Sequence, residues 1–338
     1  MGAHNRLVGP GLALLGLACA FAAGAESKPL IVYVSPNPIG VNDFLKLGRI
    51  GTEAAARQLG ARSKTYESTD PTTQRQNVEA AARAGAKVVV TVGFEFNDII
   101  PPVATAHPGV KFLMVDTCTA KPLPNVYCGT FREYEPSFLA GAEAALTSKS
   151  GKVGAVGALD IPFLHRFTDG FAEGAKYVRP DITVEPTLWV GGNNPFSDPA
   201  RGEQRGAAMV AEGADRIDAV GAGSNGGIFK AMTGDALAIG VDTNQCPQAP
   251  GKVLDNVVKR TDVLIEKAVA GIFKGGEPPM VTFGLKEGGM NLTGLEPDAA
   301  RSQCEIVKFP DVIPKLAELR QKIIDGTIEL KDPMLAGK

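Results

Sequence analysis

Short apolar runs alternate with longer amphipathic stretches along nearly the whole chain, and this alternation most constrains the fold. The first run is PLIVYVSP, near residue 30, and an amphipathic stretch follows it from about residue 44 to 59. Further runs are KVVVTVG, KFLMVD, KVGAVGA, DAVGAGS and ALAIGVD. Strands that alternate with helices in this way are typical of βαβ units and parallel sheets. The sequence therefore predicts an α/β protein with doubly wound parallel sheets.

The runs form two series, which divide near residue 130. A chain of this length exceeds what one hydrophobic core usually holds, so we expect two lobes. The first lobe is predicted to contain residues 26–130 and the second residues 131–246. The remainder is too small for a third domain, so about 247–280 should complete the first lobe and 281–338 the second. A chain that crosses between lobes in this way forms a hinge.

The first 25 residues have the pattern of a secretory signal peptide. Arg6 precedes an apolar stretch from Leu12 to Ala23, and small residues continue to Ala25. The apolar stretch is shorter than the roughly 20 residues that a membrane-spanning helix needs. We therefore expect cleavage after Ala25 and a periplasmic protein. The alternative is a lipid attached to Cys19, which would anchor the protein to a membrane.

The charged residues are nearly balanced, with 35 Lys and Arg against 37 Asp and Glu and a formal net charge of −2. No basic block is present, so nucleic acid and anionic membrane surfaces are not expected partners. A hydrophobic content of 44% with dispersed charges is typical of soluble globular proteins. We expect a monomer.

Four of the five cysteines follow the predicted signal peptide, at positions 118, 128, 246 and 304. In an oxidising compartment an even number permits disulfides, and four cysteines allow three pairings. Cys118 and Cys128 flank a short loop between two expected strands, which favours a bridge between them. Cys246 and Cys304 would then join the loop after ALAIGVD to the C-terminal segment. The chain has no CxxC pair, so redox and zinc motifs are not indicated.

Catalytic motifs are scarce in this chain. It has no GxSxG, HExxH or Walker sequence, and none of its three histidines has a partner at metal-binding spacing. Gly221, Gly223 and Gly226 match the spacing of a dinucleotide fingerprint, but they lie far from the first βα unit. We interpret them as positions where the backbone or a helix N-terminus approaches a ligand. We predict a binding protein without cofactor or metal rather than an enzyme.

Polar residues follow several expected strands in both series. They are Asp116 after KFLMV, Asp242 after ALAIGV, Asp160 after KVGAVGA, Asn97 and Asp98 after VVVTVGFEF, and the pair Lys259-Arg260 after VLDNVV. Ligands of open parallel sheets bind outside the carboxyl ends of the strands. A single acid at such a place is commonly a helix cap or a turn residue. Acids at corresponding ends in both lobes favour a shared ligand cleft.

Some aromatic residues also lie beyond strand ends. Phe44, Phe94 and Phe96 have apolar neighbours and could fill the core, whereas Phe196 lies among Asn, Pro, Ser and Asp. Facing rings from two lobes would hold a flat heterocycle by stacking, which contributes roughly 1 to 3 kcal/mol per nucleobase.

Five ordered segments of the chain carry a family resemblance. They are FREYEPSFLAGAEAAL, GKVGAVGALDIPFLHRFTDGFAEGAK, SDPARGEQRGAAMVAEGADRI, AIGVDTNQ and VVKRTDVLI. Together they resemble the basic membrane lipoprotein family, the purine nucleoside receptor type of ABC transporter substrate-binding proteins. The resemblance covers almost the whole chain after the signal peptide. It implies a type I periplasmic binding fold with two lobes joined by a hinge, and delivery of the ligand to an ABC permease in the inner membrane.

The resemblance also implies roles for individual residues. Asp242 and Lys259 would bind ribose hydroxyls, and the backbone of Gly223 would approach the sugar. Asp116 would face the base, and Phe44 and Phe196 would sandwich the purine.

The first ligand loop departs from the family pattern, which has an asparagine directly after the aromatic residue. This chain reads Val41-Asn42-Asp43-Phe44-Leu45, so Asn42 becomes a candidate ligand-binding residue. Asn244 also replaces the second acid of the family's VDSD run. These changes leave a free nucleobase or another flat polar heterocycle open as the ligand. A ligand sensor on the same scaffold and an exported nucleoside hydrolase are further alternatives.

Overall fold

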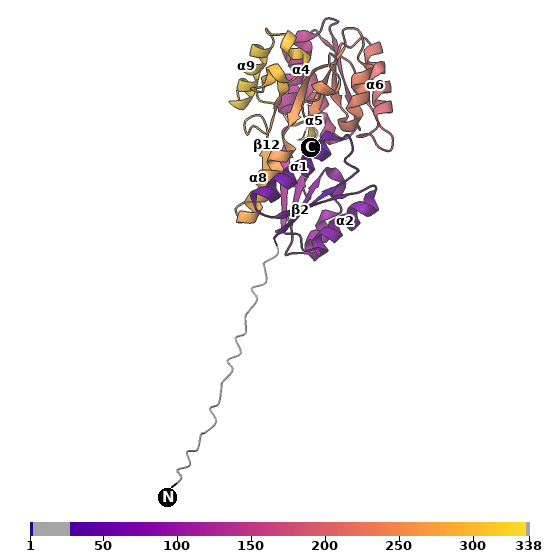
Figure 1. Cartoon of the computed structure of the whole chain (residues 1–338). Helices are drawn as coiled ribbons and strands as arrows, with labels where there is room; N and C mark the ends of the chain where they lie inside the picture. Colours follow the sequence, from indigo (N-terminus) through magenta and orange to yellow (C-terminus); the bar gives the residue numbers. More distant parts are fainter. Residues whose placement is uncertain (3–27, 336–338) are drawn as a thin grey trace.

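The computed structural model describes residues 1, 2 and 28–335, and Figure 1 shows two lobes stacked end to end. Each lobe contains one mostly parallel sheet with helices on its faces. The predicted doubly wound two-lobed α/β fold is thus confirmed. Beyond residues 1 and 2, the predicted signal peptide and Cys19 lie outside the described residues. Among the helices that are described, none is long and apolar enough to cross a membrane.

The sheet of the first lobe has the strand order β12-β5-β4-β3-β1-β2, with every pairing parallel. Its strands are β1 (Leu30–Ser35), β2 (Arg62–Glu67), β3 (Val88–Val92), β4 (Lys111–Val115), β5 (Val126–Phe131) and β12 (Met280–Phe283). Its helices are α1 (Asp43–Gln58), α2 (Pro71–Arg83), α3 (Ile100–Ala106) and α8 (Thr261–Lys274). β1, β3 and most of β4 are buried apolar runs, as expected for parallel strands covered on both faces.

The sheet of the second lobe has the order β13-β11-β10-β9-β6-β7, with β8 also paired to β6. Its strands are β6 (Lys152–Gly157), β7 (Thr183–Val184), β8 (Leu188–Trp189), β9 (Arg216–Val220), β10 (Leu237–Asp242), β11 (Val253–Lys259) and the antiparallel β13 (Met290–Leu292). Its helices are α4 (Tyr134–Thr147), α5 (Pro162–Val178), α6 (Pro199–Ala211), α7 (Asn225–Ala231) and α9 (Ile313–Ile324).

Within residues 28–335 the chain crosses between the lobes three times, between β5 and α4, between β11 and α8, and between β12 and β13. The first crossing lies where the sequence predicts it. The second does not, because 247–280 was assigned whole to the first lobe, whereas β11 pairs with β10 in the second. Parallel neighbours usually need a helical crossover of a dozen or more residues. Here the connection contains a 3-10 turn, Cys246–Gln248, in place of a helix. The sequence therefore has no helical pattern there to indicate that β10 and β11 are parallel neighbours. The third crossing lies slightly later than predicted, because β12 pairs with β5.

Two glycines bring α4 and α5 into close contact. A Cβ atom on Gly141 would overlap the carbonyl oxygen of Phe171, and one on Gly174 would overlap that of Phe138. The helices can therefore approach this closely only because both positions lack a side chain. This packing fixes α5, whose first turns face the cleft between the lobes.

Two disulfides confirm the predicted pairing. Cys118 joins Cys128 with a Cα–Cα distance of 5.3 Å, and Cys246 joins Cys304 at 5.0 Å. The first ties the loop after β4 to β5, and the second ties the turn after β10 to the C-terminal segment. Each bridge thus fixes a loop that begins at the carboxyl end of a strand.

Candidate functional site

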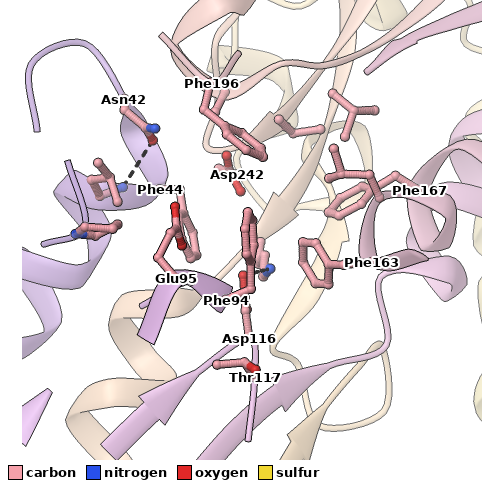
Figure 2. Close-up of a pocket in the computed structure, with 18 of the residues that line it drawn as sticks. Asn42, Phe44, Phe94, Glu95, Asp116, Thr117, Phe163, Phe167, Phe196 and Asp242 are labelled. Carbon is pink, nitrogen blue, oxygen red and sulfur yellow. Dashed lines mark hydrogen bonds and ion pairs between the residues drawn. The ribbon is translucent and has the colours of Figure 1, made fainter. Parts of the chain in front are cut away.

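A cavity lies between the two lobes and contains about 970 Å³ of empty space, counting its open side. Side chains from both lobes point into it, as Figure 2 shows. The first lobe contributes Asn42, Phe44, Phe94, Glu95, Asp116 and Thr117, and the second contributes Phe163, Phe167, Phe196, Asp242 and Lys259. The cavity is therefore rich in aromatic rings and in carboxyl groups.

The cavity brings together most of the residues that the sequence predicts for the site. Asn42, Phe44, Asp116, Phe196, Asp242 and Lys259 all line it. Asn42 also caps α1, because its Oδ1 accepts the N–H of Leu45 at 3.2 Å.

Gly223 does not line the cavity, in contrast to its predicted approach to the sugar. Its N–H donates to the carbonyl of Phe196 at 2.9 Å, and a Cβ atom there would lie 2.9 Å from the same oxygen. Its neighbour Ala222 lines the cavity instead, with a φ of +50°. Gly223 therefore holds the loop that carries Phe196.

Asp116 and Asp242 occupy matching places in the two lobes. Asp116 directly follows β4, and Asp242 is the last residue of β10. Both have a φ of +70°, a left-handed conformation that is uncommon for residues other than glycine. Such strained residues cluster at ligand sites and persist only where the surrounding structure fixes them. In this conformation both side chains reach the cavity.

Lys259 provides the ammonium group of the cavity. Its Nζ lies 2.7 Å from Asp116 Oδ2 and 2.9 Å from Glu133 Oε1, and the side chain is only 2% exposed. The rings of Phe44, Phe131, Phe163 and Phe167 lie 4.9 to 5.8 Å from Nζ, within the range of cation–π attraction. Burial lowers the pKa of Lys259, but the nearby carboxylates outweigh burial and raise it above its usual value. Lys259 is therefore a buried cation held by acids and aromatic faces.

The charged contacts continue from Lys259 to the C-terminal segment. Glu133, in the first hinge crossing, is fully buried and also contacts Arg166 of α5 at 3.3 Å. Arg166 donates two hydrogen bonds to Asp332, of 2.9 and 2.5 Å. This pair fixes the segment that places Met334 at the cavity wall. The network thus joins β4, β11, the hinge, α5 and the C-terminal segment.

Three acids of the cavity have raised pKa values. Burial raises the pKa of Asp116 to about 6, although Lys259 opposes the change. Burial likewise raises the pKa of Asp242 to about 7, and that of Glu95 to about 7 with a further contribution from Asp116. Asp116 Oδ1 is buried without a hydrogen-bond partner in the described part of the chain. Unsatisfied buried acceptors of this kind favour a ligand that brings hydrogen-bond donors.

The aromatic residues differ in part from the sequence prediction. The sequence leaves Phe94 as a possible core residue, but this residue is 38% exposed, and its ring lies 6.4 Å from that of Phe196, which comes from the other lobe. Phe44 instead lies beside Lys259. Sequence reasoning missed Phe163 and Phe167. Their spacing of four at the start of α5 indicates a shared helix face, but nothing in it shows that this face meets a ligand cavity.

Asp43 joins the lobes at a place outside the cavity lining. Its Oδ2 accepts hydrogen bonds from Thr243 at 3.2 Å, Gln245 at 3.1 Å and Gln248 at 2.9 Å, all in the second lobe. Burial opposes ionisation, but Lys46, Gln245 and Gln248 outweigh it and lower the pKa of Asp43. An ionised carboxylate at the start of α1 therefore holds the two lobes together.

The other polar residues at strand ends have separate positions. Asn97 lines the cavity, while Asp98 is exposed and lies outside its lining. Asp160 is exposed and lies 2.9 Å from His165 at the surface. Phe96, a core candidate, is fully buried. Asp98 and Asp160 therefore do not contribute to the cavity.

The family model for PnrA-like ABC transporter substrate-binding proteins matches residues 34–333. The ABC transporter nucleoside-binding protein BmpA of Lactococcus lactis subsp. cremoris is 30% identical over 317 residues, covering 86% of this chain and 85% of that protein. The CD4+ T-cell-stimulating antigen of Listeria monocytogenes is 28% identical, covering 76% of this chain and 74% of the antigen.

A solved structure supports the same assignment. A solute-binding protein of an ABC transporter system from Aeropyrum pernix K1 is 26% identical and superposes with a TM-score of 0.78, covering 90% of this chain and 94% of that one. The matching family, the two-lobed fold and the cavity between the lobes agree with one another. The chain therefore belongs to the PnrA-like family of ABC transporter substrate-binding proteins.

Proposed function

We propose that this substrate-binding protein carries a purine nucleoside, or a closely related flat polar ligand, to an ABC permease in the inner membrane. The observation that carries the proposal is the composition of the cavity. Aromatic rings from both lobes surround a space whose walls also hold Asp116, Asp242 and Lys259. Rings suit a flat heterocycle, and buried carboxylates suit hydroxyl and N–H donors. The name of the Lactococcus relative, a nucleoside-binding protein, supports the same ligand class.

Each part of the ligand has a suitable partner in the cavity. Within residues 28–335 no side chain donates a hydrogen bond to Asp242, so its oxygens would accept bonds from the hydroxyls of a ribose, and Lys259 lies near it as the cation. Asp116 Oδ1 would accept a donor of the base. Phe196 would stack on one face of the heterocycle, and Phe94 or Phe44 would cover the other.

Binding would stabilise the closed arrangement of the lobes. Asp116 and Phe94 belong to the first lobe and Asp242 and Phe196 to the second, so a ligand that touches all four bridges the cleft. A ligand shifts such an equilibrium by the difference between its affinities for the two states. The closed form is then the state that a permease would recognise.

The proposal includes export, with cleavage after Ala25 or lipid attachment at Cys19. A relative from Pyrococcus furiosus, 30% identical, bears the name of a lipoprotein. Intact mass spectrometry of the exported protein separates these outcomes. A chain that starts at Glu26 supports cleavage, and one that starts at a diacylglyceryl Cys19 supports anchoring.

Calorimetric titration tests the ligand class. The purified protein would be titrated with adenosine, guanosine, inosine, adenine and xanthine, with D-ribose as the control for the sugar alone. We expect micromolar or tighter binding of at least one nucleoside and none of ribose. Tight binding of a free base with no gain from the sugar would instead identify a nucleobase receptor. Binding of none of the five purines would overturn the proposal.

A further inference from the structure

Glu95 is an acid of the cavity wall that the proposed function does not use. It lies in a 3-10 turn, Phe94–Phe96, directly after β3 and between a cavity-lining ring and a core ring. Its side chain folds back over Gly93, where a Cβ atom would collide with Glu95 Oε2. Figure 2 shows it directed into the cavity from the first lobe, as Phe44 is. Gly93 therefore lets the carboxyl group take this position.

Glu95 has no partner side chain within residues 28–335. No hydrogen bond or ion pair joins its carboxyl group to another residue there, and its own backbone N–H is the donor that favours ionisation. The side chain is half-buried at the cavity surface. A carboxyl group so placed gains most from a ligand that brings N–H donors.

The cavity has a surplus of acceptor oxygens. Among the described residues that line it, Glu95, Asp116 and Asp242 are acids and Lys259 is the cation. That cation already contacts Asp116 and Glu133, so it does not offset the charge on Glu95. A phosphate or carboxylate on the ligand would meet this excess of negative charge. The cavity therefore suits a neutral or cationic ligand that is rich in hydrogen-bond donors.

Glu95 is placed to meet the edge of a heterocycle that stacks in the cavity. It follows Phe94, whose ring lies 6.4 Å from that of Phe196. A heterocycle that is held through its faces presents its edge to the polar groups of the wall. The two oxygens of one carboxylate match two adjacent N–H donors, as in the paired bonds between carboxylates and guanidinium groups.

We propose that Glu95 is a specificity-determining residue that binds, as a carboxylate, a ligand edge with two adjacent N–H donors. In a purine this edge is the ring N–H and exocyclic amino group of guanine, so the site favours 2-amino-6-oxopurines. Adenine presents a ring acceptor beside its amino group, and hypoxanthine lacks the amino group. This inference rests on the proposed function. A site with buried polar groups discriminates strongly, because a ligand without the matching donors leaves those groups unpaired.

The experiment compares wild-type protein with Glu95→Gln by calorimetry at pH 8, using guanosine, inosine and adenosine. Inosine is the matched ligand, because it differs from guanosine only by the missing amino group. We expect wild-type protein to bind guanosine about 10- to 100-fold more tightly than inosine, as for hydrogen bonds to a charged group. Glu95→Gln should remove most of this preference by weakening guanosine binding, and should change inosine binding by less than about threefold.

The control variant is Asp98→Asn. Asp98 lies three residues farther along the same loop and is exposed, outside the cavity lining. Its neutralisation removes one negative charge near the cleft without removing an acceptor from the cavity. All three affinities should stay at their wild-type values. Melting curves of both variants would show that the fold is intact.

A pH series adds a second measurement. Burial and Asp116, which faces Glu95 from the end of β4, raise the pKa of Glu95, and Tyr33 of β1 also interacts electrostatically with Glu95. Donors that bind the carboxylate should lower this pKa, so the guanosine preference of wild-type protein should grow between pH 6 and 8. Asp116 titrates in the same pH range. The contribution of Glu95 is therefore the difference between the pH series of wild-type protein and that of Glu95→Gln.

Each outcome decides between the two proposals. Glutamine has the shape of a protonated glutamic acid, so full guanosine binding by Glu95→Gln would overturn the carboxylate role. Equal binding of guanosine and inosine by wild-type protein would also overturn it, while leaving the proposed function intact. Binding of no purine by wild-type protein would overturn the proposed function itself.

Discussion

The acids at the strand ends of the two lobes, Asp116 and Asp242, have the same backbone conformation but different surroundings. Both have a φ of +70°, and both side chains are largely buried at the cavity wall. Asp116 forms an ion pair of 2.7 Å with Lys259, which belongs to the other lobe. Asp242 has no hydrogen-bonded side-chain partner in the described part of the chain, and its pKa is the higher of the two. Asp116 thus joins the lobes through one oxygen and keeps the other for a ligand, whereas Asp242 keeps both oxygens for a ligand.

Removal of Lys259 should have the largest effect on stability, because it takes away the ion pair that distinguishes Asp116 from Asp242. Lys259→Met leaves the buried Asp116 without an ion-pair partner and leaves Glu133 with Arg166 as its cation. Loss of one partner from a buried ion pair typically costs about 3 to 5 kcal/mol in the free energy of unfolding. Urea denaturation at pH 8 measures this cost. Lys230→Met, which removes an exposed ion pair with Glu203, should cost at most about 1 kcal/mol. Equal costs for the two variants would contradict the structural role of Lys259.

Separate neutralisation of the two acids tests the comparison directly. Asp242→Asn should weaken ligand binding by about 2 to 3 kcal/mol, because a charged acceptor of the ligand becomes neutral. Its free energy of unfolding at pH 8 should stay the same or rise, since an uncompensated buried charge is removed. Asp116→Asn should weaken binding and lower stability as well, because Lys259 loses an ion-pair partner. Calorimetry and urea denaturation of both variants provide the measurements. Identical effects on stability would show that the two acids are equivalent.

The stability of the unliganded protein should depend on the protonation of Asp242. Its pKa of about 7 lies above that of an exposed aspartate, so the folded state binds a proton that the unfolded state has released. The contribution is full below the unfolded-state pKa of about 4 and is lost as the pH rises through 7. One pKa unit corresponds to about 1.4 kcal/mol, so wild-type protein should lose about 2.6 kcal/mol relative to Asp242→Asn between pH 5 and 8. A constant difference across this range would contradict the raised pKa.

Substitution of Asp43 should have the smallest effect on ligand affinity, because Asp43 joins the lobes outside the cavity. Asp43→Ala removes three hydrogen bonds to the second lobe and should favour the open arrangement. We expect ligand binding to weaken by about fivefold, since a smaller fraction of molecules is competent to bind. Calorimetry measures the affinity, and small-angle X-ray scattering measures the larger radius of gyration. Asp98→Ala is the matched control. An unchanged affinity and radius would show that cavity contacts alone set the closed arrangement.

Local sequence order predicted much of the fold and part of the site. Asp116 and Asp242 could be predicted because each comes directly after an apolar run, where parallel sheets bind their ligands. The pairing of Cys118 with Cys128 followed from the short loop between two strands.

Residues placed by tertiary packing could not be predicted in this way. Phe163 and Phe167 reach the cavity because α5 packs closely on α4. Glu133 reaches Lys259, behind the cavity lining, because the hinge turns there. Glu95 faces the cavity through a 3-10 turn after β3 rather than through the strand itself. The assignment of β11 to the wrong lobe has a similar cause, because a short turn replaced the expected helix between parallel strands.

The two disulfides connect ligand binding to the compartment in which the chain matures. Cys118 comes two residues after Asp116 and Cys246 four residues after Asp242, so each bridge restrains a loop that begins with a cavity acid. Disulfides form and persist in oxidising compartments and are rare where cellular thiols stay reduced. A chain retained in a reducing cytosol would keep the hydrophobic core of each lobe but lack both restraints. Under the proposed export, oxidative folding would thus complete the receptor outside the cytosol, and the precursor would compete little for the ligand inside the cell.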